Sequence, residues 1–282
     1  MSRVLRHLAY SAQVLLGRTN AGRGLTVLPD DQFLVSYPRS GSTWTRFLIG
    51  NLVHTDVPIT FANIEEYLPS IYICSNRDLR RRPRPRLLTS HECFDPRYKT
   101  VIYVVRDPRD VAISYYHYCI KNRDIEDGYP LESFVTRYIA ADVNPDYDRW
   151  GSWADNVMSW LTMRQNNSRF LLLRYEDMVE SPERELAKVA AVLDIDATPE
   201  RLRRAAELSA ADRMRKLEKE QHQLWKQTKK TRSDKPFVRA ASSGGWRSSL
   251  PEQCVEQIEA AWEPVMRDLG YPLGKDVPAT SR

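Results

Sequence analysis

The segment YPRSGSTW, residues 37–44, combines residue types that bind anions. It follows an apolar run that begins at Phe33, and apolar residues recur after it with helical spacing, which predicts a strand, a tight loop and a helix. The unpartnered N–H groups and the dipole at such a helix start favour a bound phosphate or sulfate. The candidate binding residues in this loop are Arg39, Ser40, Gly41, Ser42 and Thr43.

The loop differs from the ATP-binding pattern G-x-x-x-x-G-K-[ST], in which a Lys follows the second glycine. Gly41 is the single glycine here, and Arg39 precedes it. The segment therefore predicts a P-loop-like site of another kind, although a well-capped helix without a ligand shows the same turn residues.

Two further segments place an arginine beside a predicted turn. KTVIYVVRDPRDVAISYYHYCIK puts Arg106 at the end of a buried strand over 100–105, and Ser114 on the helix that Asp107 and Pro108 predict. KPFVRAASSGGWRSSL, near the C-terminus, puts Arg239 beside a Gly-rich loop.

The elements that must position these residues alternate along the chain. Strands are predicted in 33–37, at 86–91, at 100–105 and in RFLLLRYEDM (169–178), and helices follow them. This alternation predicts an α/β fold, a single domain with a central parallel sheet flanked by helices. We assign residues 1–282 to one domain, with an N-terminal amphipathic segment at 1–29 and a catalytic core at 30–272.

Composition narrows the functional classes. The 282 residues carry a net charge of +5, which favours acidic ligands. The four cysteines show neither zinc spacing nor a disulfide pattern, so we predict no metal site and a cytoplasmic location. No apolar stretch approaches the roughly 20 residues that span a bilayer. The N-terminal segment suits a transit peptide, a membrane-surface helix or a helix packed on its own domain.

Two basic segments raise the question of nucleic-acid binding. RDLRRRPRPR at 77–86 is predicted to be a surface connection rather than a helix, and 213–235 an exposed helix running into a mobile loop. Neither has interleaved exposed aromatics, so no nucleic-acid partner is expected.

Together the three motifs resemble those of the 3′-phosphoadenosine 5′-phosphosulfate (PAPS)-dependent sulfotransferase family, particularly its cytosolic branch. The resemblance runs from about Phe33 to Trp246. It implies a PAPS donor, no metal, and a 5′-phosphosulfate loop at YPRSGSTW, where the cytosolic branch usually has Lys in place of Arg39. The implied donor-binding residues are Arg39, Ser40, Gly41, Ser42, Thr43, Trp44, Arg106, Ser114, Tyr175, Arg239, Ala240 and Ala241.

The same resemblance implies an in-line transfer to an acceptor. His91, in PRLLTSHECFDP, falls where the family's catalytic base follows a short strand, and Glu92 is the rival base. Arg39 would stabilise the charge that develops on the transferred and leaving groups. The implied acceptor is a small molecule with a hydroxyl or an amine (a phenol, alcohol, lipid or sugar), and we expect the segments 58–76 and 123–150 to bind it. No oligomeric state is predicted.

Two other functions stay open at this point. One is an atypical P-loop phosphotransferase, which the lack of a Gly-Lys-Ser/Thr sequence and of a magnesium carboxylate disfavours. The other is a non-catalytic nucleotide-binding or RNA-binding protein that uses the two basic segments.

Overall fold

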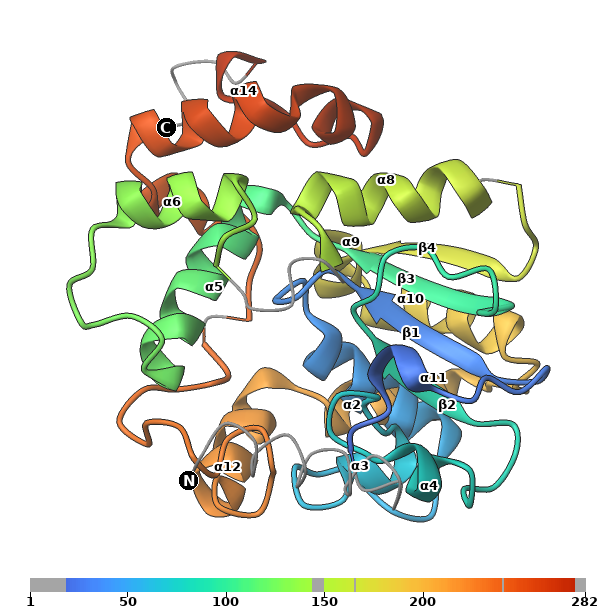
Figure 1. Ribbon diagram of the computed structural model, residues 1–282. Helices are drawn as coiled ribbons and strands as arrows, with labels where there is room; N and C mark the ends of the chain where they lie inside the picture. The colour runs from blue at the N-terminus through green and yellow to red at the C-terminus, as the bar shows by residue number, and fades with distance from the viewer. Residues whose placement is uncertain (1–18, 144–149, 165, 240, 277–282) are drawn as a thin grey trace, which may run out of the picture.

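Four parallel strands form the central sheet of this computed structural model (Figure 1). The structure describes residues 19–143, 150–164, 166–239 and 241–276. The strands are β1 (Gln32–Ser36), β2 (Leu87–Ser90), β3 (Thr100–Val105) and β4 (Phe170–Arg174), in the spatial order β2-β1-β3-β4. The chain leaves β1 to one side for β2 and then crosses to the other side for β3. Such a switch point is where open parallel sheets bind ligands, beyond the carboxyl ends of the strands.

Helices cover both faces of the sheet (Figure 1). At the switch point, α2 (Ser42–Val53) follows β1 and α5 (Pro108–Asn122) follows β3. The short helices α3 (Ile64–Tyr67) and α4 (Asn76–Leu79) lie between α2 and β2 in the sequence, and the 3-10 helix η1 (Gly22–Gly24) precedes β1. The others are α6 (Leu131–Ile139), α8 (Trp153–Arg164), α9 (Tyr175–Glu180), α10 (Pro182–Val192), α11 (Pro199–Leu208), α12 (Ala211–Gln221), α13 (Trp246–Ser249), α14 (Glu252–Asp268) and the 3-10 helix η2 (Gly274–Asp276).

Alternate residues of each strand enter two different cores. Phe33 and Val35 of β1 pack into one core with Tyr103 of β3 and with residues of α6, α8 and α14. Leu34 points to the opposite core with Ile102 and with residues of α2, α10 and α11. Because both faces are buried, the strands read as nearly continuous apolar runs. The predicted single-domain α/β fold with a flanked parallel sheet is confirmed.

The predicted start of α5 is confirmed in detail. The Asp107 carboxylate accepts a hydrogen bond from the Arg109 backbone N–H at 3.0 Å, and Pro108 occupies the first turn. This cap fixes where the helix begins. Arg106 therefore stands at the junction between β3 and α5.

Three local predictions were wrong. RFLLLRYEDM is not one strand: pairing with β3 ends at Arg174, and Tyr175–Glu180 forms α9, whose first turn carries Glu176 and Asp177. The 77–86 segment begins inside the one-turn helix α4. The 213–235 segment is exposed only in part, because Trp225 is buried between Phe61 and Phe237.

The predicted N-terminal segment lies mostly outside the described residues, which begin at Thr19. None of the helices in the described part of the chain is long and apolar enough to cross a membrane.

Candidate functional site

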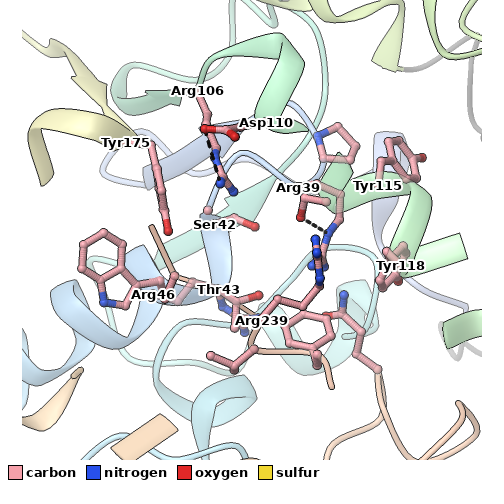
Figure 2. Close-up of a pocket in the computed structure, with 18 of the residues that line it drawn as sticks. Arg39, Ser42, Thr43, Arg46, Arg106, Asp110, Tyr115, Tyr118, Tyr175 and Arg239 are labelled. Carbon is pink, nitrogen blue, oxygen red and sulfur yellow. Dashed lines mark hydrogen bonds and ion pairs between the residues drawn. The ribbon is translucent and has the colours of Figure 1, made fainter. Parts of the chain in front are cut away.

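A cavity of about 390 Å³ opens at the carboxyl edge of the sheet (Figure 2). The loop after β1, the residue after β2, the start of α5 and the segment 237–245 line it. The structure brings eleven of the predicted residues to its wall: Arg39, Gly41, Ser42, Thr43, Trp44, His91, Arg106, Ser114, Tyr175, Arg239 and Ala241. Ser40 is buried and does not line it, and Ala240 lies outside the described residues.

Gly41 makes the turn between β1 and α2 possible. It caps α2 with φ of 104°, a backbone conformation that side chains disfavour. A Cβ at this position would also lie 2.5 Å from Cδ2 of Tyr175. The loop and the first residue of α9 therefore approach each other as closely as glycine allows.

Replacing Gly41 with alanine is expected to lower the free energy of unfolding by about 2 kcal/mol or more, because strained backbone and a displaced Tyr175 ring add together. Chemical denaturation measures this loss. Gly128→Ala is the matched control, since Gly128 also has positive φ, 84°, but no atom lies within 4 Å of the position that its Cβ would take. Equal losses in the two variants would show that the approach to Tyr175 contributes nothing.

Three guanidinium groups meet in the cavity. Figure 2 shows Arg39, Arg106 and Arg239 pointing into the same space. Burial, together with the charges of Arg39 and Arg106, lowers the pKa of Arg239 to about 10. Burial is also the main cause that lowers the pKa of Arg39. Buried cations that line one cavity and lower one another's pKa indicate a site for an anion.

Asp110 is the only carboxylate among the described lining residues, and backbone groups occupy it. Its oxygens accept hydrogen bonds from the backbone N–H groups of Gly244 (2.7 Å) and Trp246 (2.9 Å). Its distance to the Arg106 guanidinium is 3.9 Å. Asp110 thus ties the C-terminal segment to α5 and leaves the cavity with an excess of positive charge.

Arg106 has a hydrogen-bond donor that no described residue uses. One of its terminal nitrogens donates to the Ser242 carbonyl at 3.0 Å, whereas its Nε is buried and has no hydrogen-bond partner among the described residues. Its guanidinium lies 4.3 Å from the centre of the Tyr175 ring. A buried donor without a partner is costly, so this group suits an anionic ligand.

One stripe of α5 faces the cavity. Asp110, Ser114 and Tyr118 follow each other at four-residue spacing and all line it. The Ser114 hydroxyl accepts a hydrogen bond from Nε of Arg39 at 3.3 Å, and the Arg39 guanidinium lies 4.5 Å from the centre of the Tyr118 ring. The helix therefore places its own cavity-lining residues and Arg39 on the same side of the cavity.

His91 presents a neutral imidazole. Its Nδ1 lies 2.7 Å from the Ser36 carbonyl oxygen, which can only accept, so Nδ1 carries the proton and Nε2 keeps a free electron pair. Burial lowers the pKa of His91 to about 4, and the Arg46 and Arg39 charges act in the same direction. The ring is parallel to that of Tyr72, with centres 5.6 Å apart. Near neutral pH, His91 is thus an unprotonated base.

Glu92 points elsewhere. It is buried, accepts hydrogen bonds from Arg23 (3.2 Å) and from the Tyr72 hydroxyl (3.1 Å), and does not line the cavity. It instead lines a separate surface depression together with Arg23. Its geometry is that of a structural carboxylate.

Trp44 and Tyr175 form one wall of the cavity. Their ring centres are 5.4 Å apart in an edge-to-face arrangement, and Trp44 donates from Nε1 to the Ser209 carbonyl at 3.0 Å. Such a fixed aromatic corner suits a planar, uncharged ring.

Three residues at or beside the cavity wall were not predicted from the sequence: Asp110, Tyr72 and Trp150. Asp110 had a visible signal, since it stands four residues after Arg106 in VVRDPRD. Tyr72 and Trp150 lie in the two segments expected to bind the acceptor, but no local pattern distinguishes them from core aromatics. The Tyr72 hydroxyl accepts from the His91 backbone N–H (2.9 Å) and from Nε1 of Trp150 (3.1 Å). In the described part of the chain, no cluster of three or more His, Cys, Asp or Glu side chains could hold a metal.

Comparisons with known proteins identify relatives of this chain and structures with its fold. A family model described as a sulfotransferase domain matches residues 29–270. Sulfotransferase 1E1 of Rattus norvegicus is 27% identical over 256 residues, covering 85% of this chain and 84% of the relative. Sulfotransferase 1B1 of Mus musculus is 27% identical over 258 residues, covering 84% and 83%. The crystal structure of mouse sulfotransferase SULT7A1 complexed with PAP superposes with a TM-score of 0.72 at 24% identity, covering 89% of each chain.

Proposed function

The chain belongs to the sulfotransferase family, and on this premise we propose that it transfers the sulfuryl group of PAPS to a hydroxyl or amine of a small-molecule acceptor. The observation that carries the proposal is the cluster of Arg39, Arg106 and Arg239 in a cavity that also holds a neutral His91. The negative charges of PAPS would balance the three guanidinium groups. The free electron pair of His91 would take the proton of the acceptor.

The donor would lie along the loop after β1 and the stripe of α5. Arg39 and the N–H groups of Gly41, Ser42 and Thr43 suit the 5′-phosphosulfate, with Ser40 supporting the loop from its buried position. Arg106 suits the 3′-phosphate because its Nε lacks a partner among the described residues.

The remaining donor contacts follow from the same placement. Ser114 and Arg239 would complete the 3′-phosphate site, together with the backbone of Ala241. For Ala240, which lies outside the described residues, the same role rests on the sequence motif alone. Trp44 and Tyr175 form the aromatic corner that suits the adenine. PAP, adenosine 3′,5′-bisphosphate, is the product that this site would retain after transfer.

We assign the general base to His91. Nε2 takes the proton of the acceptor hydroxyl while the acceptor oxygen forms a bond to sulfur and the bond from sulfur to the 5′-phosphate oxygen breaks. Arg39 stabilises the charge on the departing phosphate. Glu92 is a weaker candidate because two hydrogen bonds hold it outside the cavity. No metal takes part in this proposal.

The aromatic wall beside His91 supports a partly apolar acceptor, which leaves phenols, alcohols, lipids and sugars as classes to screen. A cytoplasmic location is part of the proposal, supported by the four free cysteines, Cys74, Cys93, Cys119 and Cys254. A metal-dependent phosphotransferase is not favoured, because the one carboxylate of the described lining already accepts two backbone hydrogen bonds.

Calorimetric titration with PAP tests the proposed donor site. We expect tight, metal-independent binding to the wild type, and about 100-fold weaker binding to Arg106→Ala, because charge-assisted hydrogen bonds to phosphate are lost. Arg97→Ala is the matched control, since Arg97 pairs with Asp95 at the surface, outside this cavity. Preferential binding of ATP with magnesium, or of neither nucleotide, would contradict the proposed function.

A further inference from the structure

Two basic segments far apart in the sequence come together on one face of the protein. We call this face the basic rim and define it by Arg77, Arg80, Arg81, Lys226, Lys229, Lys230 and Leu224, all exposed. The first three lie in or just after α4, and the others follow α12. In Figure 1, α3, α4 and α12 lie along the same lower side of the molecule.

Contacts on both sides of α3 bring the two segments together. Glu65 of α3 accepts a hydrogen bond from Nε1 of Trp225 at 3.0 Å, and its backbone carbonyl accepts one from Arg82 at 3.3 Å. The positive charges of Lys226 and Arg82 both act on the Cys74 thiol, where they oppose the rise in its pKa that burial causes. The arginines of α4 and the lysines after Trp225 therefore flank the same short helix.

The cations of the basic rim differ from other surface arginines of this chain. Arg84, Arg97 and Arg232 each pair with a nearby carboxylate. Arg77, Arg80 and Arg81 show no ion pair or side-chain hydrogen bond within the ranges that the structure describes. Residues 222–230 contain three lysines and no acidic residue. Glu66 of α3 and Asp78 of α4 are exposed carboxylates on the same face, and the six cations of the basic rim outnumber them, so the face keeps an excess of positive charge.

The basic rim borders the acceptor side of the cavity. Tyr72 and Ile73 line the cavity, and α4 begins only three residues after Ile73. Gln227 also lines it and directly follows Lys226. Tyr72, Ile73 and Trp150 thus form an apolar wall of the cavity, in which Tyr72 and Trp150 pack beside His91 and Ile73 leads into α4.

We propose that the basic rim docks the protein on an anionic lipid bilayer, so that a lipophilic hydroxyl acceptor passes from the bilayer along this apolar wall to His91. Positive charge around the entrance attracts anionic headgroups. Leu224, 63% exposed among the lysines, supplies an apolar side chain that can enter the headgroup region. The docking step stands by itself, whereas the delivery step rests on the proposed function.

A nucleic acid or an acidic polysaccharide fits these observations less well. Single-stranded nucleic acids stack on exposed aromatic side chains, and the basic rim contains none, since Trp225 is buried. A polysaccharide gains nothing from Leu224 or from an apolar passage behind the charges. A bilayer combines the two chemistries, with negative charge at its surface and hydrocarbon beneath it.

The first described residues of the chain lie beside α4. Asn20 pairs with Ser75, and Ala21 donates its N–H to the Cys74 carbonyl at 2.9 Å, so both residues lie next to the segment that leads into α4. The sequence of residues 1–18 contains Arg3, Arg6 and Arg18 and no acidic residue.

Vesicle sedimentation tests the docking step. The full chain is spun with vesicles of phosphatidylcholine alone or with added phosphatidylglycerol, at low and high salt. We expect binding only to the anionic vesicles, weaker at high salt, and about 100-fold weaker for Arg77→Glu/Arg80→Glu/Arg81→Glu. The charge-matched control is Arg169→Glu/Arg203→Glu/Arg267→Glu, at exposed positions on other elements, and it should bind nearly as the wild type does.

Several results would overturn docking on a bilayer: no binding of the wild type, equal binding to neutral vesicles, wild-type binding by the α4 variant, or capture by heparin or RNA without binding to anionic vesicles. PAP calorimetry on the α4 variant shows whether it is folded, because none of its changed residues lines the cavity.

Delivery is tested with two acceptors, phenol in solution and a long-chain alcohol carried in the vesicles. The α4 variant should keep its turnover of phenol and lose at least about tenfold on the vesicle-borne alcohol. Equal losses on both acceptors would overturn delivery. A wild type that neither binds PAP nor sulfates phenol would instead contradict the proposed function, and sedimentation would still decide the docking step.

Discussion

Replacing His91 with alanine is expected to lower kcat by about 10²-fold or more while the affinity for PAP stays near that of the wild type, because general-base catalysis contributes on this scale. The structure gives the physical reason. Ser36 holds the proton on Nδ1, which leaves the electron pair of Nε2 for the acceptor. Steady-state kinetics with PAPS and an acceptor from the screen measures the loss, and calorimetry checks the donor site.

His54→Ala is the matched control for this variant. His54 ends α2, packs on Tyr67 with ring centres 4.5 Å apart, and does not line the cavity. Its removal should leave kcat nearly unchanged. If His91→Ala retained near-normal kcat, the imidazole would have no part in proton transfer.

Titration of the donor-free enzyme by histidine-ring NMR tests the protonation state behind this prediction. Burial lowers the pKa of His91 to about 4, so the ring should stay neutral from neutral pH down and take up its proton only as the pH falls toward that value. An ordinary histidine would protonate near about 6.5. Titration of His91 near that ordinary value would contradict the lowered pKa that burial gives the ring.

Replacing Arg39 with alanine is the second change with a large expected effect. We expect kcat to fall by about 10² to 10³-fold, because a preorganised cation next to the departing phosphate stabilises charge that appears only in the transition state. Arg39→Lys should recover part of the activity, since it restores the charge but not the planar fork. Kinetics on both variants, with saturating PAPS, measures the two effects.

Stability distinguishes this role from a structural one. The Arg39 guanidinium packs against Tyr118 and Phe237, with 4.5 Å and 4.7 Å to the ring centres, but it also repels Arg106 and Arg239. These effects oppose each other, so the free energy of unfolding of the donor-free variant should change by only about 1 kcal/mol. A larger loss of stability, with kcat recovered in the folded fraction, would make Arg39 a packing residue.

Local signals explain what the sequence could predict. The β-branched run before Arg106, the Asp107 cap and Pro108 act within a few residues of each other, so β3, α5 and the placement of Ser114 followed from the chain alone. The glycine at 41 indicated its turn for the same reason.

Other features depend on partners far along the chain. Asp110 is bound by Gly244, 134 residues away, so its role had no local signal beyond its spacing from Arg106. Trp225 stands in a highly charged segment, yet Phe61 and Phe237 bury it. Tyr175 begins a helix rather than ending a strand, although Glu176 gave a local indication. Tertiary packing decided the positions of Asp110 and Trp225.

The stripe of α5 has a consequence for how related chains can diverge. Asp110, Ser114 and Tyr118 face the cavity only because they share one helical register. A single inserted or deleted residue between them would turn the rest of the stripe by about 100° and carry it off the site. Substitutions on the far side of this helix leave that register intact. Natural relatives with the same donor should therefore vary in residue type along α5 but keep the number of residues between Arg106 and Tyr118 constant.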